Sequence, residues 1–113
     1  MARSQLFLLP PGFVDKGQRE YCPECAEIWG FLHYFPAIKS SLDIRHEELA
    51  HPRAGLAALL GDGSWNCPTL VLADDAPDAA GVAISLANGR RYIGNARDIA
   101  RYFAEIHGTP IPR

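Results

Sequence analysis

Short apolar runs alternate along this chain with segments of helical periodicity, and this alternation constrains the fold more than any other feature. Apolar, β-forming runs predict strands within residues 5–9, 42–49, 68–73 and 82–94. Helical spacing predicts helices between the first three strands and after the last one. The order strand, helix, strand, helix, strand, strand, helix indicates an α/β fold in which a central sheet has helices packed on both of its faces.

The boundaries of the helices are marked by proline, glycine and asparagine. Pro23 suits the first position of a helix that Pro36 ends, and Pro52 lies near the start of a short helix within 51–61. Asn95 is a natural N-cap for the last helix, which Gly108 terminates. We expect residues 10–20 to form a loop, because proline, glycine and charged residues dominate them.

Size and charge exclude several classes of protein. The 113 residues fit one compact domain over 1–113. A formal net charge of -2 offers no basic footprint for nucleic acid, and no apolar run is long enough to span a bilayer. The apolar stretch near the N-terminus is too short for a secretory signal. We therefore expect a cytoplasmic protein with neither a nucleic-acid nor a membrane partner, and the sequence leaves the oligomeric state open.

Two cysteines, Cys22 and Cys25, lie two residues apart at the predicted start of the first long helix, in "REYCPECAEIWGFLHYF". The third is Cys67, and an odd number of cysteines argues against a disulfide framework. In a reducing compartment, paired cysteines more often indicate redox chemistry or metal binding. The pair is therefore a redox dithiol, half of a metal site, or two small core residues.

The dithiol interpretation follows from the physical chemistry of a helix N-terminus. Unpaired N–H groups and the helix dipole favour a thiolate there, so Cys22 would attack a substrate disulfide. Cys25, one turn on and directed inward, would then displace the mixed disulfide. Glu24 opposes this, because a neighbouring carboxylate disfavours a thiolate.

Three segments resemble the thioredoxin superfamily, and most closely the glutaredoxins and the N-terminal domain of glutathione transferases. "REYCPEC" is similar to the glutaredoxin Cys-Pro-x-Cys stretch, "NCPTLVL" to the cis-proline segment, and "NGRRYIGNARDIARYFAEI" to the final hairpin and helix. The resemblance implies a thioredoxin-like fold with a central mixed four-stranded sheet and helices on both faces. The chain is also similar to a bacterial family of small thioredoxin-like proteins catalogued only as a domain of unknown function, which adds no mechanism.

The resemblance also assigns roles to individual residues. Cys22 and Cys25 would be catalytic, and Pro68 would be the cis-proline that shapes a substrate loop. Cys67 would lie beside the pair, so that three thiols converge. Glutathione is a possible co-substrate rather than a bound cofactor, and the partner would be glutathione or a protein disulfide. The candidate substrate-binding residues are Arg19, Tyr21, Pro23, Cys67, Pro68, Asn95 and Asp98.

Departures from the family pattern keep a second hypothesis open. Glu24 replaces a neutral residue, Cys67 precedes the presumed cis-proline, and Ala96 stands where transferases carry a hydroxyl that holds glutathione. The first hypothesis is a glutaredoxin-like thiol–disulfide oxidoreductase. The second is a non-catalytic binding module on the same scaffold, which could hold a metal through its three cysteines, although no histidine lies at ligand spacing in the sequence.

Overall fold

The computed structural model describes residues 3–113, and its centre is a mixed five-stranded sheet. The strands lie in the order β4 (Asp43–His46), β1 (Gln5–Leu8), β5 (Thr69–Val71), β7 (Arg91–Ile93) and β6 (Ala83–Ile84). Strand β1 is parallel to β4 and antiparallel to β5, while β7 is antiparallel to both of its neighbours. The predicted count of four strands is therefore wrong for this sheet.

The fifth strand comes from the segment 82–94, which folds back on itself. Asn88-Gly89 lies between β6 and β7, and Gly89 has a φ of 75°, a conformation that favours glycine. Both arms of this hairpin join the sheet, where β6 is a two-residue edge strand. A strand of two residues is too short to show the period-two alternation from which strands are predicted.

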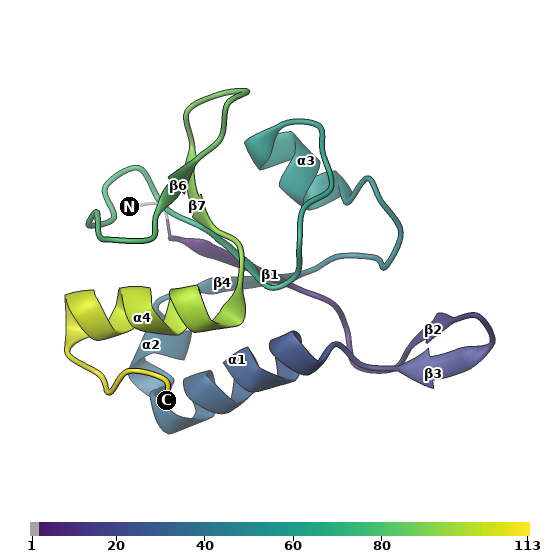
Figure 1. Cartoon of the computed structure of the whole chain (residues 1–113), viewed down its shortest axis with the longest axis horizontal. Helices are drawn as coiled ribbons and strands as arrows, with labels where there is room; N and C mark the ends of the chain where they lie inside the picture. Colours follow the sequence, from purple (N-terminus) through teal and green to yellow (C-terminus); the bar gives the residue numbers. More distant parts are fainter. Residues whose placement is uncertain (1–2) are drawn as a thin grey trace.

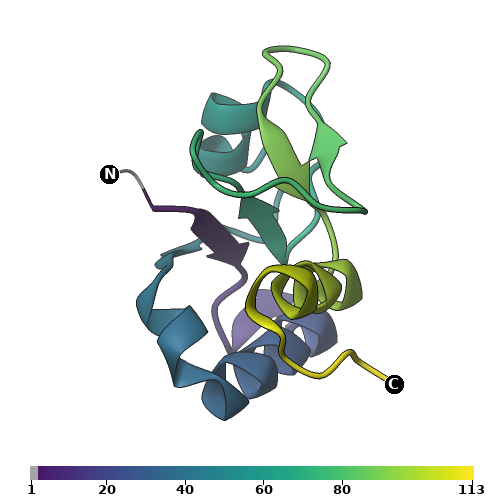
Figure 2. The same cartoon turned by 90° about the vertical axis from the view of Figure 1, so that its left-hand side faces the viewer.

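Helices lie on both sides of the sheet, and the α/β class is confirmed (Figures 1 and 2). Helices α1, α2 and α4 occupy one side, with α1 beside α4, and α3 lies on the other. Between the layers, the central strands β1 and β5 are almost entirely buried. The helices are α1 (Pro23–Tyr34), α2 (Pro36–Ser40), α3 (Ala54–Leu60) and α4 (Ala96–His107).

Proline positions explain where α1 begins and ends. Pro23 occupies the first turn of α1, where its missing N–H leaves no hydrogen bond unmade. Pro36 ends α1 as expected, and it also opens the short helix α2, which was not predicted from the sequence. Leu32 and Ile28 are buried on the inner face of α1, whereas Trp29 is only half-buried.

The segment expected to be a loop, 10–20, instead contains a β-hairpin. Strand β2 (Phe13–Asp15) pairs with β3 (Gln18–Glu20), and the hairpin extends away from the rest of the molecule (Figure 1). Lys16 and Gly17 both have positive φ, which matches a two-residue type I′ turn. Asparagine, aspartate or glycine usually occupies the first of these positions, so a lysine there hides the turn from sequence analysis.

Two X-Pro peptide bonds are cis: His51–Pro52, just before α3, and Cys67–Pro68, just before β5. The second is the bond at which the resemblance implied a cis-proline. Within residues 3–113, no helix combines the length and the apolar character needed to cross a lipid bilayer.

Candidate functional site

Cys22 is the N-cap of helix α1. Its backbone is extended, with φ of -79° and ψ of 116°, so its side chain turns back over the first turn of the helix. The backbone N–H of Cys25 donates to the Cys22 sulfur at 3.2 Å. A free N–H group and the positive end of the helix dipole therefore face this sulfur, and both stabilise negative charge there.

The Cys22 thiol is half-buried and reaches the segment that precedes β5. It donates to the carbonyl oxygen of Cys67 at 3.5 Å. This contact joins residues 45 positions apart in the sequence and places the start of α1 against the bend at Pro68. The Pro68 side chain is fully buried, and the backbone carbonyl just before it is the group that Cys22 contacts.

Cys25 has a very different environment, although it is only one turn further on. Its side chain is 2% exposed, and its sulfur accepts a hydrogen bond from the Leu9 backbone N–H at 3.4 Å. Burial, reinforced by the hydrogen bond with Cys22, raises the pKa of the Cys25 thiol from 9.0 to about 12, despite the opposing effect of the Leu9 N–H. Cys25 is thus a protonated, shielded thiol at neutral pH.

Cys67 is also buried, and burial raises the pKa of its thiol to about 11. The charge of Arg53 acts in the opposite direction, and that of Glu47 adds to the rise. Its carbonyl oxygen, not its thiol, makes the hydrogen bond to Cys22. Residues 3–113 contain no group of three or more histidine, cysteine or acidic side chains placed to hold a metal ion, so the metal-binding hypothesis gains no support from the geometry.

Two polar side chains hold the Cys67 segment in place, and neither was singled out from the sequence. The Arg53 guanidinium is buried and donates to the carbonyl oxygens of Trp65 and Leu49, both at 3.0 Å. The Asn66 amide donates to the carbonyl oxygen of Gly94 at 2.9 Å. A buried arginine in a loop carries no sequence periodicity, so only the tertiary structure could identify it.

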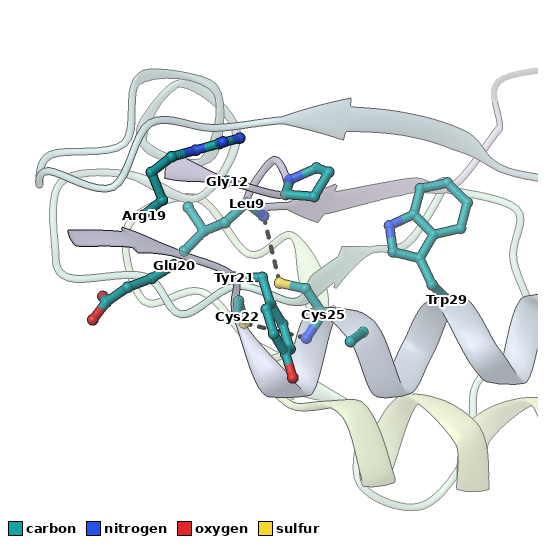
Figure 3. A pocket seen from close by; sticks show the side chains of 10 residues that line it. Leu9, Gly12, Arg19, Glu20, Tyr21, Cys22, Cys25 and Trp29 are labelled. Atoms are coloured by element: carbon teal, nitrogen blue, oxygen red, sulfur yellow. Dashed lines mark hydrogen bonds between the residues drawn. The ribbon is translucent and has the colours of Figure 1, made fainter. Parts of the chain in front are cut away.

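A cavity of about 460 Å³ opens beside the two sulfurs of the motif, between the hairpin and α1 (Figure 3). Cys22 and Cys25 line it, and so do the predicted residues Arg19 and Tyr21. The rest of its lining was not predicted: Leu9, Pro11, Gly12, Glu20, Ala26 and Trp29. Trp29 follows the buried Ile28 in α1 and is only half-buried, so it lines the cavity from the edge of the buried face of the helix.

The other predicted site residues lie elsewhere. Pro23 opens α1 and does not line this cavity. Asn95 and Asp98 bind each other at the start of α4: the Asn95 side chain accepts from the Asp98 N–H at 2.9 Å, and its amide donates to the Asp98 carboxylate at 2.8 Å. Asn95 is therefore the N-cap, as its sequence position predicts, and it does not line the cavity beside Cys22.

Glu24, inside the motif, reaches across to α4. Its carboxylate accepts a hydrogen bond from the Ala96 backbone N–H at 3.3 Å. Ala96 is the first residue of α4, so this N–H has no partner within the helix. The negative charge of Glu24 is thus stabilised by the α4 dipole, and the side chain links the N-termini of α1 and α4.

Residues 3–111 match a family model described as "Protein of unknown function (DUF3088)". The chain belongs to this family. No curated protein and no solved structure matches the chain. For this DUF3088 member, the functional argument therefore rests on the geometry around Cys22.

Proposed function

We propose that this protein is a thiol–disulfide oxidoreductase with a glutaredoxin-like dithiol on a thioredoxin-like fold. The observation that carries the proposal is the asymmetry of the motif. The Cys22 sulfur lies at a helix N-terminus beside an open cavity, and the Cys25 sulfur lies protonated and buried one turn behind it. The mixed sheet with helices on both faces supports the thioredoxin-like assignment, with β6 as an added edge strand.

The reaction follows from this arrangement. The Cys22 thiolate attacks one sulfur of a substrate disulfide, and the other substrate sulfur leaves as a thiolate and takes up a proton. Cys25 then gives up its proton and attacks the Cys22 sulfur, which releases the second substrate thiol and leaves a Cys22–Cys25 disulfide. Two electrons pass from the dithiol to the substrate, and an external thiol or dithiol reductant restores the enzyme.

Burial keeps Cys25 from competing with Cys22 for substrate. A thiol with a pKa raised to about 12 has little thiolate at neutral pH, so the first attack falls to Cys22. Once Cys22 is in a mixed disulfide, its thiol no longer makes the hydrogen bond that helps to raise the pKa of Cys25. The resolving step therefore becomes easier only after substrate has bound covalently.

The substrate is a protein disulfide or a glutathione mixed disulfide, and the site of action is the cytoplasm. The substrate assignment depends on the dithiol being active, so activity is the property to test first.

The decisive experiment compares wild type with three single variants on a glutathione mixed disulfide and on a protein disulfide. Cys22→Ser should abolish turnover, and Cys25→Ser should accumulate a mixed disulfide that mass spectrometry detects. Cys67→Ser should retain the dithiol reaction, because its thiol makes no hydrogen bond to either motif sulfur. The proposal fails if wild type forms no reversible Cys22–Cys25 disulfide between about -180 and -320 mV.

A further inference from the structure

The β2–β3 hairpin forms one side of the cavity in which the motif sulfurs lie. Arg19 lies in β3 and Tyr21 on the chain between β3 and α1 (Figure 3). Leu9 and Pro11 lie on the chain that leads from β1 to β2. The hairpin extends beyond the cavity and pairs only with itself, so both of its outer strand edges are free in the described structure. A segment bound at Cys22 would therefore meet the hairpin as well.

The walls of the cavity are mainly apolar. Leu9 and Pro11 lie on one side, and Ala26 and the half-buried Trp29 line the side formed by α1. An apolar cavity of about 460 Å³ is within the usual range for a binding site. It suits a large apolar side chain, and aromatic side chains offer the greatest area to bury, roughly 150–250 Å² each.

Charge at the rim is unevenly distributed. The Arg19 guanidinium lies over Gly12, with Nη2 3.1 Å from the position that a Cβ on Gly12 would take. Arg19 is in none of the ion pairs found among residues 3–113, and Figure 3 shows the neighbouring Glu20 carboxylate directed away from both sulfurs. An acidic group on a substrate would therefore find an available cation on the hairpin side.

The charged side chains at the start of α4 already have partners. Glu24 accepts from the first N–H of α4, Asp98 pairs with Arg101 at 3.1 Å, and Arg97 pairs with Glu27 at 3.4 Å. Charge complementarity therefore favours an acidic substrate group at Arg19 rather than near α4.

We infer that the hairpin cavity selects polypeptide disulfides in which a large apolar residue lies next to the reacting cysteine and an acidic residue follows that apolar residue. The apolar side chain enters the cavity between Pro11 and Trp29, the acidic group binds Arg19, and the extended segment runs along a free edge of the hairpin. This inference rests on the proposed function, since it names the substrate class of the same site.

Peptides that carry one cysteine as a mixed disulfide with a chromogenic aromatic thiol test the inference. The residue next to the cysteine is Phe or Gly, and the following residue is Glu or Gln. Attack by Cys22 on the peptide sulfur forms the Cys22–peptide disulfide and releases the coloured thiolate, whose appearance gives the rate. Wild type should react about tenfold or more faster with the Phe peptides than with the Gly peptides, and several-fold faster with Glu than with Gln.

Matched variants separate the cavity from general effects. Arg19→Gln should remove the preference for Glu, and Arg90→Gln, an exposed arginine near the β6–β7 turn, should keep it. Ala26→Leu narrows the cavity and should reduce the preference for Phe. Ala37→Leu adds the same atoms at an exposed position of α2, outside the cavity lining, and should leave the preference unchanged. Equal rates on Phe and Gly peptides, or a faster reaction with the glutathione mixed disulfide than with any peptide, would overturn the inference.

A second readout separates this inference from the proposed function. The same peptides with serine in place of cysteine are titrated against the protein while the NMR signal of the Trp29 indole N–H is followed. If no disulfide reacts but the serine peptides bind in the expected order, the cavity inference stands and the oxidoreductase proposal fails. If every disulfide reacts at one rate and the serine peptides bind without preference, the oxidoreductase proposal stands and the cavity inference fails.

Discussion

The backbone N–H of Cys25 donates to the sulfur of Cys22 at 3.2 Å, so the two cysteines of the motif are linked directly across the first turn of α1. Both residues line the same cavity, but the side chain of Cys25 is 2% exposed and its sulfur accepts from the Leu9 N–H, whereas Cys22 is only half-buried. A pair of residues with the same chemistry is thus divided by position into an accessible thiol and a shielded one.

This division predicts selective alkylation. In the reduced, folded protein at pH 7.5, iodoacetamide should modify Cys22 about tenfold or more faster than Cys25 or Cys67, because burial raises the pKa values of the latter two thiols to about 12 and 11. Peptide mass spectrometry over a time course measures the three rates. In denaturant the three rates should become similar, and modification of Cys25 as fast as Cys22 in the folded protein would contradict the arrangement.

The raised pKa of Cys25 also predicts how stability depends on pH. In the unfolded chain the thiol returns to its ordinary pKa of 9.0, while in the folded protein it stays protonated up to about pH 12. This contribution to stability is complete below pH 9 and is lost as the pH rises toward 12, because only the unfolded state releases the proton. Urea unfolding under reducing conditions should show wild-type stability falling with pH above 9.

The matched comparison for this effect is Cys25→Ser. This variant has every other titrating group of the wild type. The difference between the two free energies of unfolding, as a function of pH, therefore reports on the Cys25 thiol alone. That gap should narrow above pH 9 by at most about 1.4 kcal/mol per pH unit. A gap that stays constant from pH 7 to 10.5 would show that the Cys25 thiol titrates normally.

Local chemistry made much of the site predictable from sequence. Pro23 and Cys22 mark the start of α1, where the first N–H groups have no partner within the helix. Proline has no N–H to leave unpaired, and the cap residue accepts a hydrogen bond from one of the others. Asn95 is a cap for the same reason, and its hydrogen bond to the Asp98 N–H is present. The apolar run at 68–73 predicted the buried strand β5, since such a run has to be covered on both faces.

The unpredicted parts depend on contacts between distant segments or on unusual residues in turns. Arg53 is buried because two carbonyl oxygens from different loops meet at its guanidinium, and no local pattern encodes that meeting. The β2–β3 hairpin was hidden by short polar strands and by a lysine with positive φ in its turn. The hydrogen-bond partner of Glu24 lies 72 residues away in the sequence. The sequence therefore showed that Glu24 is close to Cys22, but not that it contacts α4.

Glu24 should stabilise the protein through the dipole of α4. Glu24→Gln keeps a side-chain oxygen for the Ala96 N–H but removes the charge, so we expect a loss of about 0.5 kcal/mol in the free energy of unfolding. Because the carboxylate is exposed, 1 M NaCl should remove most of the difference. Glu20→Gln, on the exposed strand β3, serves as the control and should change little at either salt concentration.

Two helical glycines should respond to alanine in opposite directions. A Cβ at Gly30, in α1, would have no neighbour within 4 Å, so Gly30→Ala should stabilise the protein by about 0.5–1 kcal/mol through helix propensity alone. A Cβ at Gly55, in α3, would lie 2.8 Å from Cε2 of Phe7 and 3.0 Å from Oε1 of Glu47.

The ring of Phe7 is buried in the core, and the Glu47 carboxylate is held by the N–H groups of Gly55 and Leu56 in the first turn of α3. The cost of fitting the added methyl group therefore exceeds the gain in helix propensity, and Gly55→Ala should destabilise the protein by about 1–3 kcal/mol. Urea unfolding of both variants beside wild type measures the two changes. If Gly55→Ala were as stabilising as Gly30→Ala, α3 would not pack against β1 as closely as the structure places it.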